Sequence, residues 1–418
     1  MEEIRKKKIA VAVMHRTSYG RLKPVMKAIQ NHPQLELQVI LGSHVFLHDL
    51  LLALRHTDFK SLRRLLPWYL RAKLRPRTEL LAKMVQRDGF AIHAQVPLFF
   101  DGGSLTTMVK SVGVGLLGLP KIFNDLRPDV VLVHADRFEM LSIAVAASFM
   151  NIPVAHTQGG DVSGTIDEMV RHAITKLAHL HFPTTEKSKE RLIKMGEDPN
   201  FVFMTGCPTI DALKSVNLAI DENIYERNGL GYGSRLDLKK PFLLVMQHPV
   251  TTEYQQAAKN LQELLAAIKE VNMPTFLFWP NIDGGFDRAS EAVNEFIKDP
   301  HRPELTLYKS FNSEDFYRVL NAATVAIGNS SSFVREGSFL GTPAVLVGTR
   351  QSGRERSENT LEVDYDKNKI VAAIKAQINH GRYPTSHLYG DGHAGERIAQ
   401  ILAKANPPIQ KKFHESRT

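Results

Sequence analysis

Short runs of apolar, often β-branched residues alternate with helical patterns along the whole chain. We predict strands at 8–15, 35–42, 129–135, 153–158, 201–206, 242–248, 275–280, 305–308, 324–329 and 343–348. These runs are continuous rather than alternating, which is typical of parallel strands buried on both faces. Between them, segments such as 22–32, 142–151 and 316–323 carry apolar residues at helical spacing. The pattern therefore predicts repeated strand–helix units and an α/β fold class.

The alternation is interrupted by a polar, glycine-bearing segment at 221–241, after which a new strand begins. We place a domain boundary there. This gives an N-terminal α/β domain at 1–210 and a C-terminal α/β domain at 235–390. A final helix at 392–406 can pack back on the first domain. Two such halves facing each other form a cleft.

Residues 48–90 depart from this pattern, because their leucines recur at helical spacing opposite a basic face. Two interpretations stay open. The segment is a helical insertion that caps the first domain or contacts another copy, or it is a peripheral membrane or partner helix. In both cases we expect it to take no part in the chemistry.

Composition narrows the class of protein. The chain has 418 residues, a formal net charge of +9 and one cysteine, Cys207. A lone cysteine cannot form an internal disulfide and fits a reducing cytoplasm. The apolar run near the N-terminus is too short for a signal peptide or a membrane span, so we expect a cytoplasmic protein. The excess of basic residues favours binding of phosphorylated small molecules, and the sequence contains no nucleic-acid-binding module.

Polar residues gather where the predicted strands end. In open parallel sheets, ligands bind beyond the carboxyl ends of the strands. The residues in such places are His15, Arg16, His134, Asp136, Arg137, His156, Gln158, Asp161, Gln247, His248, Asn281, Asp283, Asn329 and the serines at 330–332. Each one alone is better explained as a cap or turn residue. Together they predict one crevice to which both halves contribute.

The segment GNSSSFVREGSFLG at 328–341 is the clearest local motif. We expect the strand to end at Gly328 and a helix to begin near Phe333. Free N–H groups and hydroxyls at a helix start bind phosphate. Glu336 follows about one turn later, where a carboxylate suits paired hydroxyls such as those of ribose. The alternative is an ordinary serine N-cap with a first-turn glutamate.

Two other patterns have simpler explanations. GVGLLG at 113–118 matches the spacing of a dinucleotide fingerprint, but helical sequence stands on both sides, so we reject an NAD site. His172 and His179 lie two helical turns apart without a set of carboxylates around them. We therefore interpret them as packing residues and expect no metal site.

Several longer motifs carry a resemblance. They are HRTSYGRLKP, VHADRFEMLSIAVAASFMNIPVAH, GGDVSGTIDEMVRHAITKLAH, GCPTIDAL, QHPVTTEY, GNSSSFVRE and GTRQSGRERSEN. In this order the chain resembles the UDP-N-acetylglucosamine 2-epimerase family. It is most similar to the hydrolysing branch, which serves sialic-acid-type pathways. The resemblance implies a GT-B-like architecture of two Rossmann-like α/β domains facing a cleft, in agreement with the pattern above.

The resemblance also implies roles for individual residues. Asp136 and Asp167 would handle protons at the sugar, and His248 would lie near the leaving phosphate. The implied substrate-binding residues are Arg16, Arg137, Gln158, Asn281, Ser330, Ser331, Glu336 and Arg350. The family often has glutamate where this chain has Gln158, and an amide cannot exchange a proton. Phe333 replaces a small residue and is expected to reshape the pocket.

The activity implied is hydrolysis of UDP-N-acetylglucosamine to UDP and N-acetylmannosamine through a 2-acetamidoglucal, with neither metal nor cofactor. One alternative is a hydrolysing 2-epimerase for a UDP-2,4-diacetamido-2,4,6-trideoxy sugar. Others are a non-hydrolysing UDP-N-acetylglucosamine 2-epimerase and, in a different class, a GT-B glycosyltransferase. We expect a homodimer or homotetramer.

Overall fold

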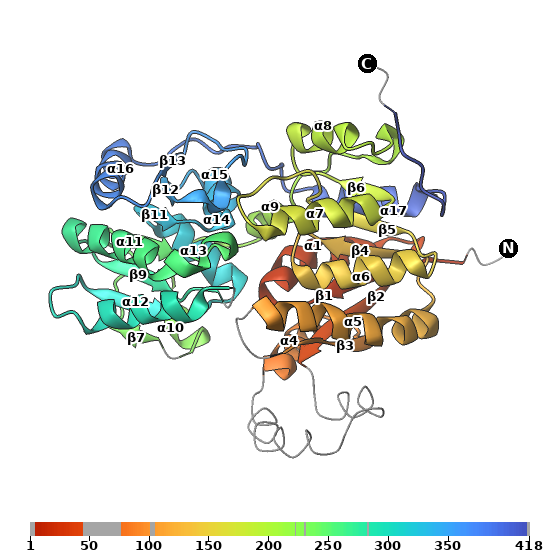
Figure 1. Cartoon of the computed structure of the whole chain (residues 1–418), viewed down its shortest axis with the longest axis horizontal. Helices are drawn as coiled ribbons and strands as arrows, with labels where there is room; N and C mark the ends of the chain where they lie inside the picture. The colour runs from red at the N-terminus through yellow and green to blue at the C-terminus, as the bar shows by residue number, and fades with distance from the viewer. Residues whose placement is uncertain are drawn as a thin grey trace, which may run out of the picture.

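The computed structural model describes residues 5–44, 77–100, 105–221, 223–229, 231–281 and 284–415. They form two α/β halves, each built around its own sheet (Figure 1). The fold class predicted from the apolar pattern is confirmed.

The sheet of the first half has the strand order β3-β2-β1-β4-β5-β6, and all its pairs are parallel. Its strands are β1 (Lys7–Val13), β2 (Leu35–His44), β3 (Ala94–Phe99), β4 (Val130–His134), β5 (Val154–Thr157) and β6 (Leu180–Phe182). Its helices are α1 (Arg16–Asn31), α4 (Arg77–Arg87), α5 (Leu105–Leu126), α6 (Phe138–Phe149), α7 (Ile166–Leu177), α8 (Glu186–Lys194), η1 (Pro199–Phe201) and α9 (Pro208–Lys214). The order reverses between β1 and β4, which is where a doubly wound sheet opens a binding crevice.

The sheet of the second half has the order β13-β12-β11-β8-β9-β10-β7, and only the pairing of β7 is antiparallel among its described strands. Its strands are β7 (Tyr232–Gly233), β8 (Leu243–Met246), β9 (Thr275–Phe278), β10 (Leu305–Tyr308), β11 (Val325–Gly328), β12 (Ala344–Val347) and β13 (Thr360–Val363). The remaining helices are α10 (Ile224–Arg227), η2 (Thr251–Gln256), α11 (Ala257–Val271), α12 (Phe286–Lys298), α13 (Ser313–Ala322), α14 (Ser331–Val334), α15 (Glu336–Leu340), η3 (Thr349–Gln351), α16 (Lys367–His380) and α17 (Ala394–Lys404).

The continuous apolar runs are explained by burial on both faces of each sheet. In β1, Ile9 and Val11 pack into one core cluster, whereas Ala10 and Ala12 pack into another on the opposite face. The helix α17, drawn in dark blue, returns to the first half and adds Ile398 to its core (Figure 1). We keep 1–210 and 235–390 as our proposed division of the chain.

Every predicted strand range except 201–206 contains a strand. The strand predicted at 201–206 is wrong. After the 3-10 turn η1, this segment pairs with β6 only through a single bridge at Val202. The strands β3, β6, β7 and β13 were not predicted. β6 and β7 are very short, and β3 carries Pro97, which is tolerated at the edge of a sheet.

Most of the proposed insertion at 48–90 lies outside the described residues. Its last part, 77–90, is structured: α4 and the turn after it place Leu81, Val85 and Phe90 in the core of the first half. This part is therefore integral to the first half and is not an added cap.

The glycine-rich segment at 113–118 lies inside the continuous helix α5, as the rejection of an NAD site requires. Gly115 is needed there because a Cβ would lie 2.2 Å from the Leu98 side chain. Within the part of the chain described here, none of the helices combines the length and apolar character that crossing a membrane requires.

Candidate functional site

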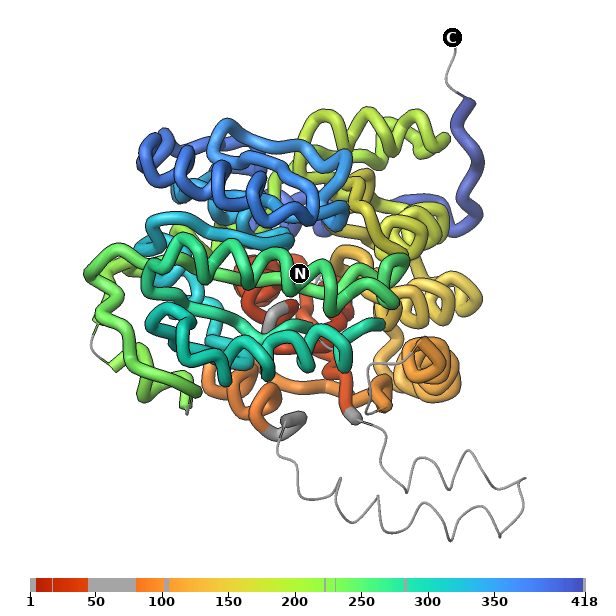
Figure 2. Tube along the Cα trace, turned by 60° about the vertical axis from the view of Figure 1, so that its left-hand side comes forward, coloured from red at the N-terminus to blue at the C-terminus, as the bar shows by residue number. Residues whose placement is uncertain are grey.

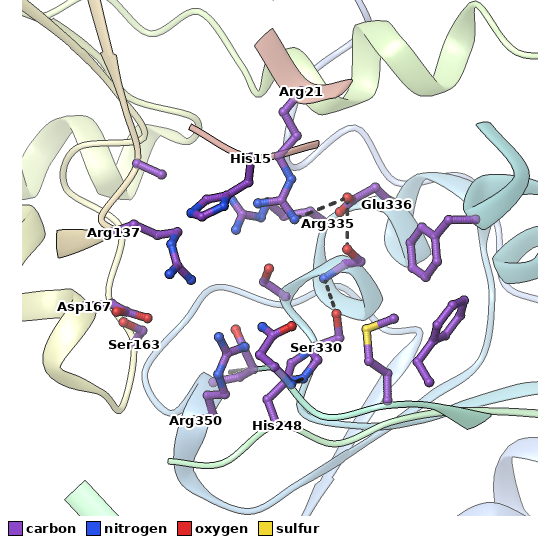
Figure 3. Close-up of a pocket in the computed structure, with 18 of the residues that line it drawn as sticks. His15, Arg21, Arg137, Ser163, Asp167, His248, Ser330, Arg335, Glu336 and Arg350 are labelled. Carbon is purple, nitrogen blue, oxygen red and sulfur yellow. Dashed lines mark hydrogen bonds and ion pairs between the residues drawn. The ribbon is translucent and has the colours of Figure 1, made fainter. Parts of the chain in front are cut away.

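A cavity of about 420 Å³ lies where the carboxyl ends of the two sheets face each other (Figure 3). The predicted site residues that line it are Asp136, Arg137, Asp167, His248, Asn281, Ser330, Ser331, Glu336 and Arg350. They come from both halves, so the structure brings together in one place most of the residues singled out from the sequence.

Aromatic side chains line part of this cavity. The ring of Phe278 lies 5.5 Å from that of Phe311 and 5.8 Å from that of Phe316, measured between centroids. Tyr317 and Met246 line the cavity as well. Flat apolar surfaces of this kind bind planar rings, and a nucleobase fits them.

The serine loop presents a carboxylate with spare hydrogen-bonding capacity. Ser332 Oγ donates to Glu336 Oε1 at 3.1 Å, and Arg21 lies 3.9 Å from the same oxygen (Figure 3). Glu336 is buried, and its Oε2 has no hydrogen-bond partner within the described ranges. A buried acceptor without a partner is costly, so this oxygen is suited to accept from a hydroxyl of a ligand.

The helix expected near Phe333 begins at Ser331 and breaks at Arg335, giving the two short helices α14 and α15. Ser330 is the N-cap and accepts from Ser332 N at 3.3 Å, so the cap of the alternative interpretation is confirmed. Its first-turn glutamate is not, because Glu336 lies beyond α14, at the start of α15. The expectation for Phe333 is wrong: its side chain is fully buried in the core of the second half and does not line the cavity.

His248 is held as a neutral donor. Asn281 N donates to its Nδ1 at 3.2 Å, so the proton of the neutral ring is on Nε2. Burial, reinforced by the charge of Arg350, lowers the pKa of His248 well below its usual value. Asn329 fixes the loop, because its Oδ1 accepts from His248 N and its Nδ2 donates to His248 O, both at 2.8 Å.

Glu139, which the sequence did not single out, anchors two side chains that line the cavity. Arg137 donates to it from Nε and Nη2 at 3.2 and 3.1 Å, and His15 Nε2 donates at 3.1 Å. Burial favours the neutral acid, but Arg137 and His15 outweigh it and lower the pKa of Glu139 to about 2. The only signal in the sequence was an acid two positions after Arg137.

Asp136 forms an ion pair with Arg171, a fully buried side chain of α7 that the sequence analysis also missed. Arg171 Nη1 donates to Asp161 O at 2.8 Å, which fixes the guanidinium. Burial alone would raise the pKa of Asp136, but the charge and hydrogen bond of Arg171 hold it below the usual range. Asp136 is therefore a carboxylate at neutral pH.

Asp167 lies in the first turn of α7, where Thr165 caps the helix by accepting from Asp167 N at 3.2 Å. Figure 3 shows Asp167 and Ser163 on the side of the cavity opposite Ser330 and Glu336. The cavity thus has carboxylates at both ends, and those at the α7 end belong to the first half.

Two predicted binding residues do not line the cavity. Gln158 is buried, accepts from Arg335 Nη1 at 2.5 Å and donates to Cys207 Sγ at 3.3 Å. Arg335 lines the cavity in its place. Arg16 Nη2 donates to Ser310 Oγ, and Arg21, further along α1, lines the cavity instead.

Several histidines have structural partners. His156 Nε2 donates to Ala135 O at 2.8 Å, and His134 Nδ1 lies 2.8 Å from Thr157 Oγ1. His179 donates to Ile409 O at 3.0 Å, and His172 lies 3.5 Å from Glu168. Across the described ranges, no group of three or more His, Cys, Asp or Glu side chains is arranged to hold a metal ion.

Comparisons with known proteins place the chain in a family. The model of the UDP-N-acetylglucosamine 2-epimerase family matches residues 77–403. The chain is 36% identical over 318 residues to the UDP-N,N'-diacetylbacillosamine 2-epimerase (hydrolyzing) of Legionella pneumophila, covering 76% of this chain and 82% of that one. It is 28% identical over 414 residues to the UDP-N-acetylglucosamine 2-epimerase of Neisseria meningitidis, covering 97% and 98%.

The fold has solved counterparts. The UDP-GlcNAc 2-epimerase of Methanocaldococcus jannaschii, solved in complex with UDP-GlcNAc and UDP, superposes with a TM-score of 0.73 at 16% identity. The match covers 95% of this chain and 100% of that one. The predicted GT-B-like architecture is confirmed. By sequence and by fold, this chain belongs to the UDP-N-acetylglucosamine 2-epimerase family of enzymes.

Proposed function

We propose that the protein is a hydrolysing 2-epimerase of a UDP-2-acetamido sugar, with UDP-N-acetylglucosamine as its first candidate substrate. The observation that carries this proposal is the composition of the cavity. One end offers aromatic rings, the serine loop and Glu336. The other offers Asp167 of α7 and also Asp136, which pairs with Arg171 of the same helix. The first end is suited to bind a nucleotide, and the second is suited to transfer protons to and from a sugar.

In this proposal the uracil lies against Phe278 and Phe311, and the ribose hydroxyls donate to Glu336. The diphosphate lies between, within reach of Ser330, His248 and Arg350. His248 supplies an Nε2–H donor, and Arg350 supplies charge. Such donors stabilise the negative charge that develops on a departing diphosphate.

The reaction begins with elimination. The C2–H bond has no neighbouring carbonyl, so the departure of UDP must drive its cleavage. A carboxylate takes the C2 proton while the C1–O bond breaks and its electron pair leaves with UDP. Arg171 keeps Asp136 ionised, so its carboxylate is free to accept the C2 proton. The product of the step is a 2-acetamidoglucal.

Hydration completes the reaction. Water adds its oxygen to C1, and a proton is delivered to C2 from the face opposite to the one that lost it, which inverts C2. Two proton-handling positions are therefore needed, and we assign the second to Asp167. The net reaction consumes one water and releases UDP and the free 2-epimer.

A second candidate substrate is UDP-N,N'-diacetylbacillosamine, the 2,4-diacetamido sugar nucleotide. It is favoured by the 36% identity to the Legionella pneumophila enzyme named for it. Both candidates share the 2-acetamido group, C1–O bond and C2 proton on which the mechanism acts. They differ at C4 and C6.

The test is to incubate the protein separately with the two nucleotide sugars and to follow UDP and the sugar by NMR. Free UDP with a free 2-epimer from either substrate supports the proposal. A UDP-linked epimer would indicate the non-hydrolysing reaction. Absence of turnover until a sugar acceptor is added would indicate a glycosyltransferase. The assignment of Asp167 to proton transfer is tested in the same assay with Asp167→Asn. Asp287→Asn is the matched control, because Asp287 is an exposed acid in the first turn of α12.

A further inference from the structure

The last described residues, 405–415, leave α17 and run along the first half toward α8 (Figures 1 and 2). In this tail, Lys411 Nζ donates to the carbonyl oxygens of Thr175, Lys176 and Ala178 at 3.0, 3.1 and 2.8 Å. These carbonyls belong to the last turn and C-cap of α7. A helix leaves its last carbonyls unsatisfied and negative, so an ammonium group there both bonds them and complements the dipole.

Lys411 also pairs with a buried acid. Glu197 is fully buried and forms ion pairs with Lys411 and with Lys176, the latter at 2.7 Å, and His181 Nε2 lies 2.8 Å from its Oε2. Although burial opposes ionisation, His181, Lys176 and Lys411 together lower the pKa of Glu197 to about 2. The lysine therefore connects the end of α7 to a fixed negative charge beside β6.

Other residues of the tail also contact the first half, near the C-terminal ends of α7 and α8. Phe413 lies over Lys176, with 5.3 Å from Nζ to the ring centroid. A Cβ on Gly196 would lie 2.2 Å from the Phe413 ring, so this glycine makes room for it. His414 N donates to Gly196 O at 3.0 Å, and His179 Nε2 donates to Ile409 O. Contacts on both sides of Lys411 thus define where the tail lies.

The opposite end of α7 is part of the cavity. This 12-residue helix carries Asp167 in its first turn, and Arg171, one turn later, holds Asp136. We propose that Lys411 is a positioning residue, which fixes α7 from its C-terminal end so that Asp167 and Arg171 stay in place for proton transfer. The proposal rests on the proposed function, in which Asp136 and Asp167 handle the protons.

The expected effect is selective. A misplacement of about 1 Å at reacting groups lowers rates by up to about 100-fold. The UDP end of the cavity is built by Ser330, His248 and Glu336 from the second half, which the tail does not hold. We therefore expect Lys411→Met to lower kcat by about 10-fold or more and to leave the Kd for UDP within about twofold of wild type.

Lys411→Met is compared with Lys411→Arg, which keeps the positive charge, and with Lys412→Met, which removes the exposed neighbouring lysine. Phe413→Ala removes the contacts of the Phe413 ring with Lys176 and Gly196, and it replaces Lys411→Met as the test variant if Lys411→Met does not fold. Folding is checked by circular dichroism. The readouts are kcat and KM, the Kd for UDP by calorimetry, and amide exchange of residues 166–177.

Faster exchange in α7 with a lower kcat, an unchanged Kd for UDP and recovery in Lys411→Arg support the proposal. An unchanged kcat in folded Lys411→Met and Phe413→Ala overturns it, as does an equal loss in Lys412→Met. Failure of the proposed function itself is recognised separately, because wild type would then release no UDP from either nucleotide sugar. Amide exchange would still report whether Lys411 holds α7.

Discussion

Replacing Asp136 by asparagine should destabilise the protein as well as slow it, because Arg171 would keep its charge in a buried place. Removing one partner of a buried ion pair typically costs about 3–5 kcal/mol. Asp136 is 19% exposed, and asparagine still offers Arg171 an acceptor. We therefore expect about 3 kcal/mol, the lower end of that range. In a folding unit of roughly 200 residues this lowers Tm by about 6–12 °C.

The loss of folding stability in Asp136→Asn should depend on pH in a defined direction. The pKa of Asp136 is depressed in the folded protein, so its ionisation contributes stability above its unfolded value, about 3.9. That contribution is lost as the pH falls through the folded value. The stability difference between wild type and Asp136→Asn should therefore be constant from pH 7 to 5 and shrink below about pH 4.

The assay is urea unfolding and thermal melting of both proteins at pH 7, 5 and 3, beside Asp125→Asn. Asp125 pairs with Lys121 at 2.6 Å on the exposed surface of α5, so its loss should cost less than about 0.5 kcal/mol. The reasoning is refuted if Asp136→Asn melts within 2 °C of wild type at pH 7, by the conversion used above. It is also refuted if the exposed control loses as much stability.

The other variants separate binding from chemistry. Asp167→Asn should lower turnover by about 10²–10⁴-fold with little change in UDP affinity or Tm, measured by steady-state kinetics, calorimetry and melting; normal turnover contradicts its role. Glu336→Ala should weaken UDP binding by about 1–3 kcal/mol in calorimetry, because ribose loses a charged acceptor, and unchanged affinity contradicts this. His248 should remain neutral and protonated on Nε2 at pH 6, which ¹⁵N NMR reads directly; a charged ring at that pH would be inconsistent with its burial. Shortening residues 55–76, which leaves α4 intact, should preserve UDP-sugar cleavage in a chain that folds by circular dichroism, and a folded variant that binds UDP without turnover contradicts this.

The apolar pattern was sufficient to predict the α/β class, because strands buried on both faces must be apolar at consecutive positions. Residues at the ends of these strands, such as Asp136 and His248, could be placed in one crevice by topology alone. What the pattern could not reveal was β6, whose three residues are too few to show a period. The 3-10 turn η1, which stands at the beginning of the range 201–206, depends on local backbone geometry rather than on hydrophobicity.

The partners of the site residues were harder to predict than the residues themselves. Glu139, Arg171 and Arg335 lie within or beside helices and resemble ordinary surface charges in sequence. Their burial follows from how α6, α7 and α14 meet the cavity, which is a tertiary property. Gln158 illustrates the converse, since its position in a familiar motif suggested ligand contact but its amide bonds Arg335.

The central claim is that UDP leaves by elimination across C1 and C2, and deuterium incorporation tests it most directly. Wild type is incubated with UDP-N-acetylglucosamine in D₂O, and the product is examined by ¹H NMR and mass spectrometry, with UDP-N,N'-diacetylbacillosamine in a parallel reaction. The account predicts free UDP and a free 2-epimer that carries one solvent-derived deuterium at C2. A free sugar that keeps its original proton and configuration at C2 would contradict it, because simple hydrolysis of the C1–O bond would then suffice.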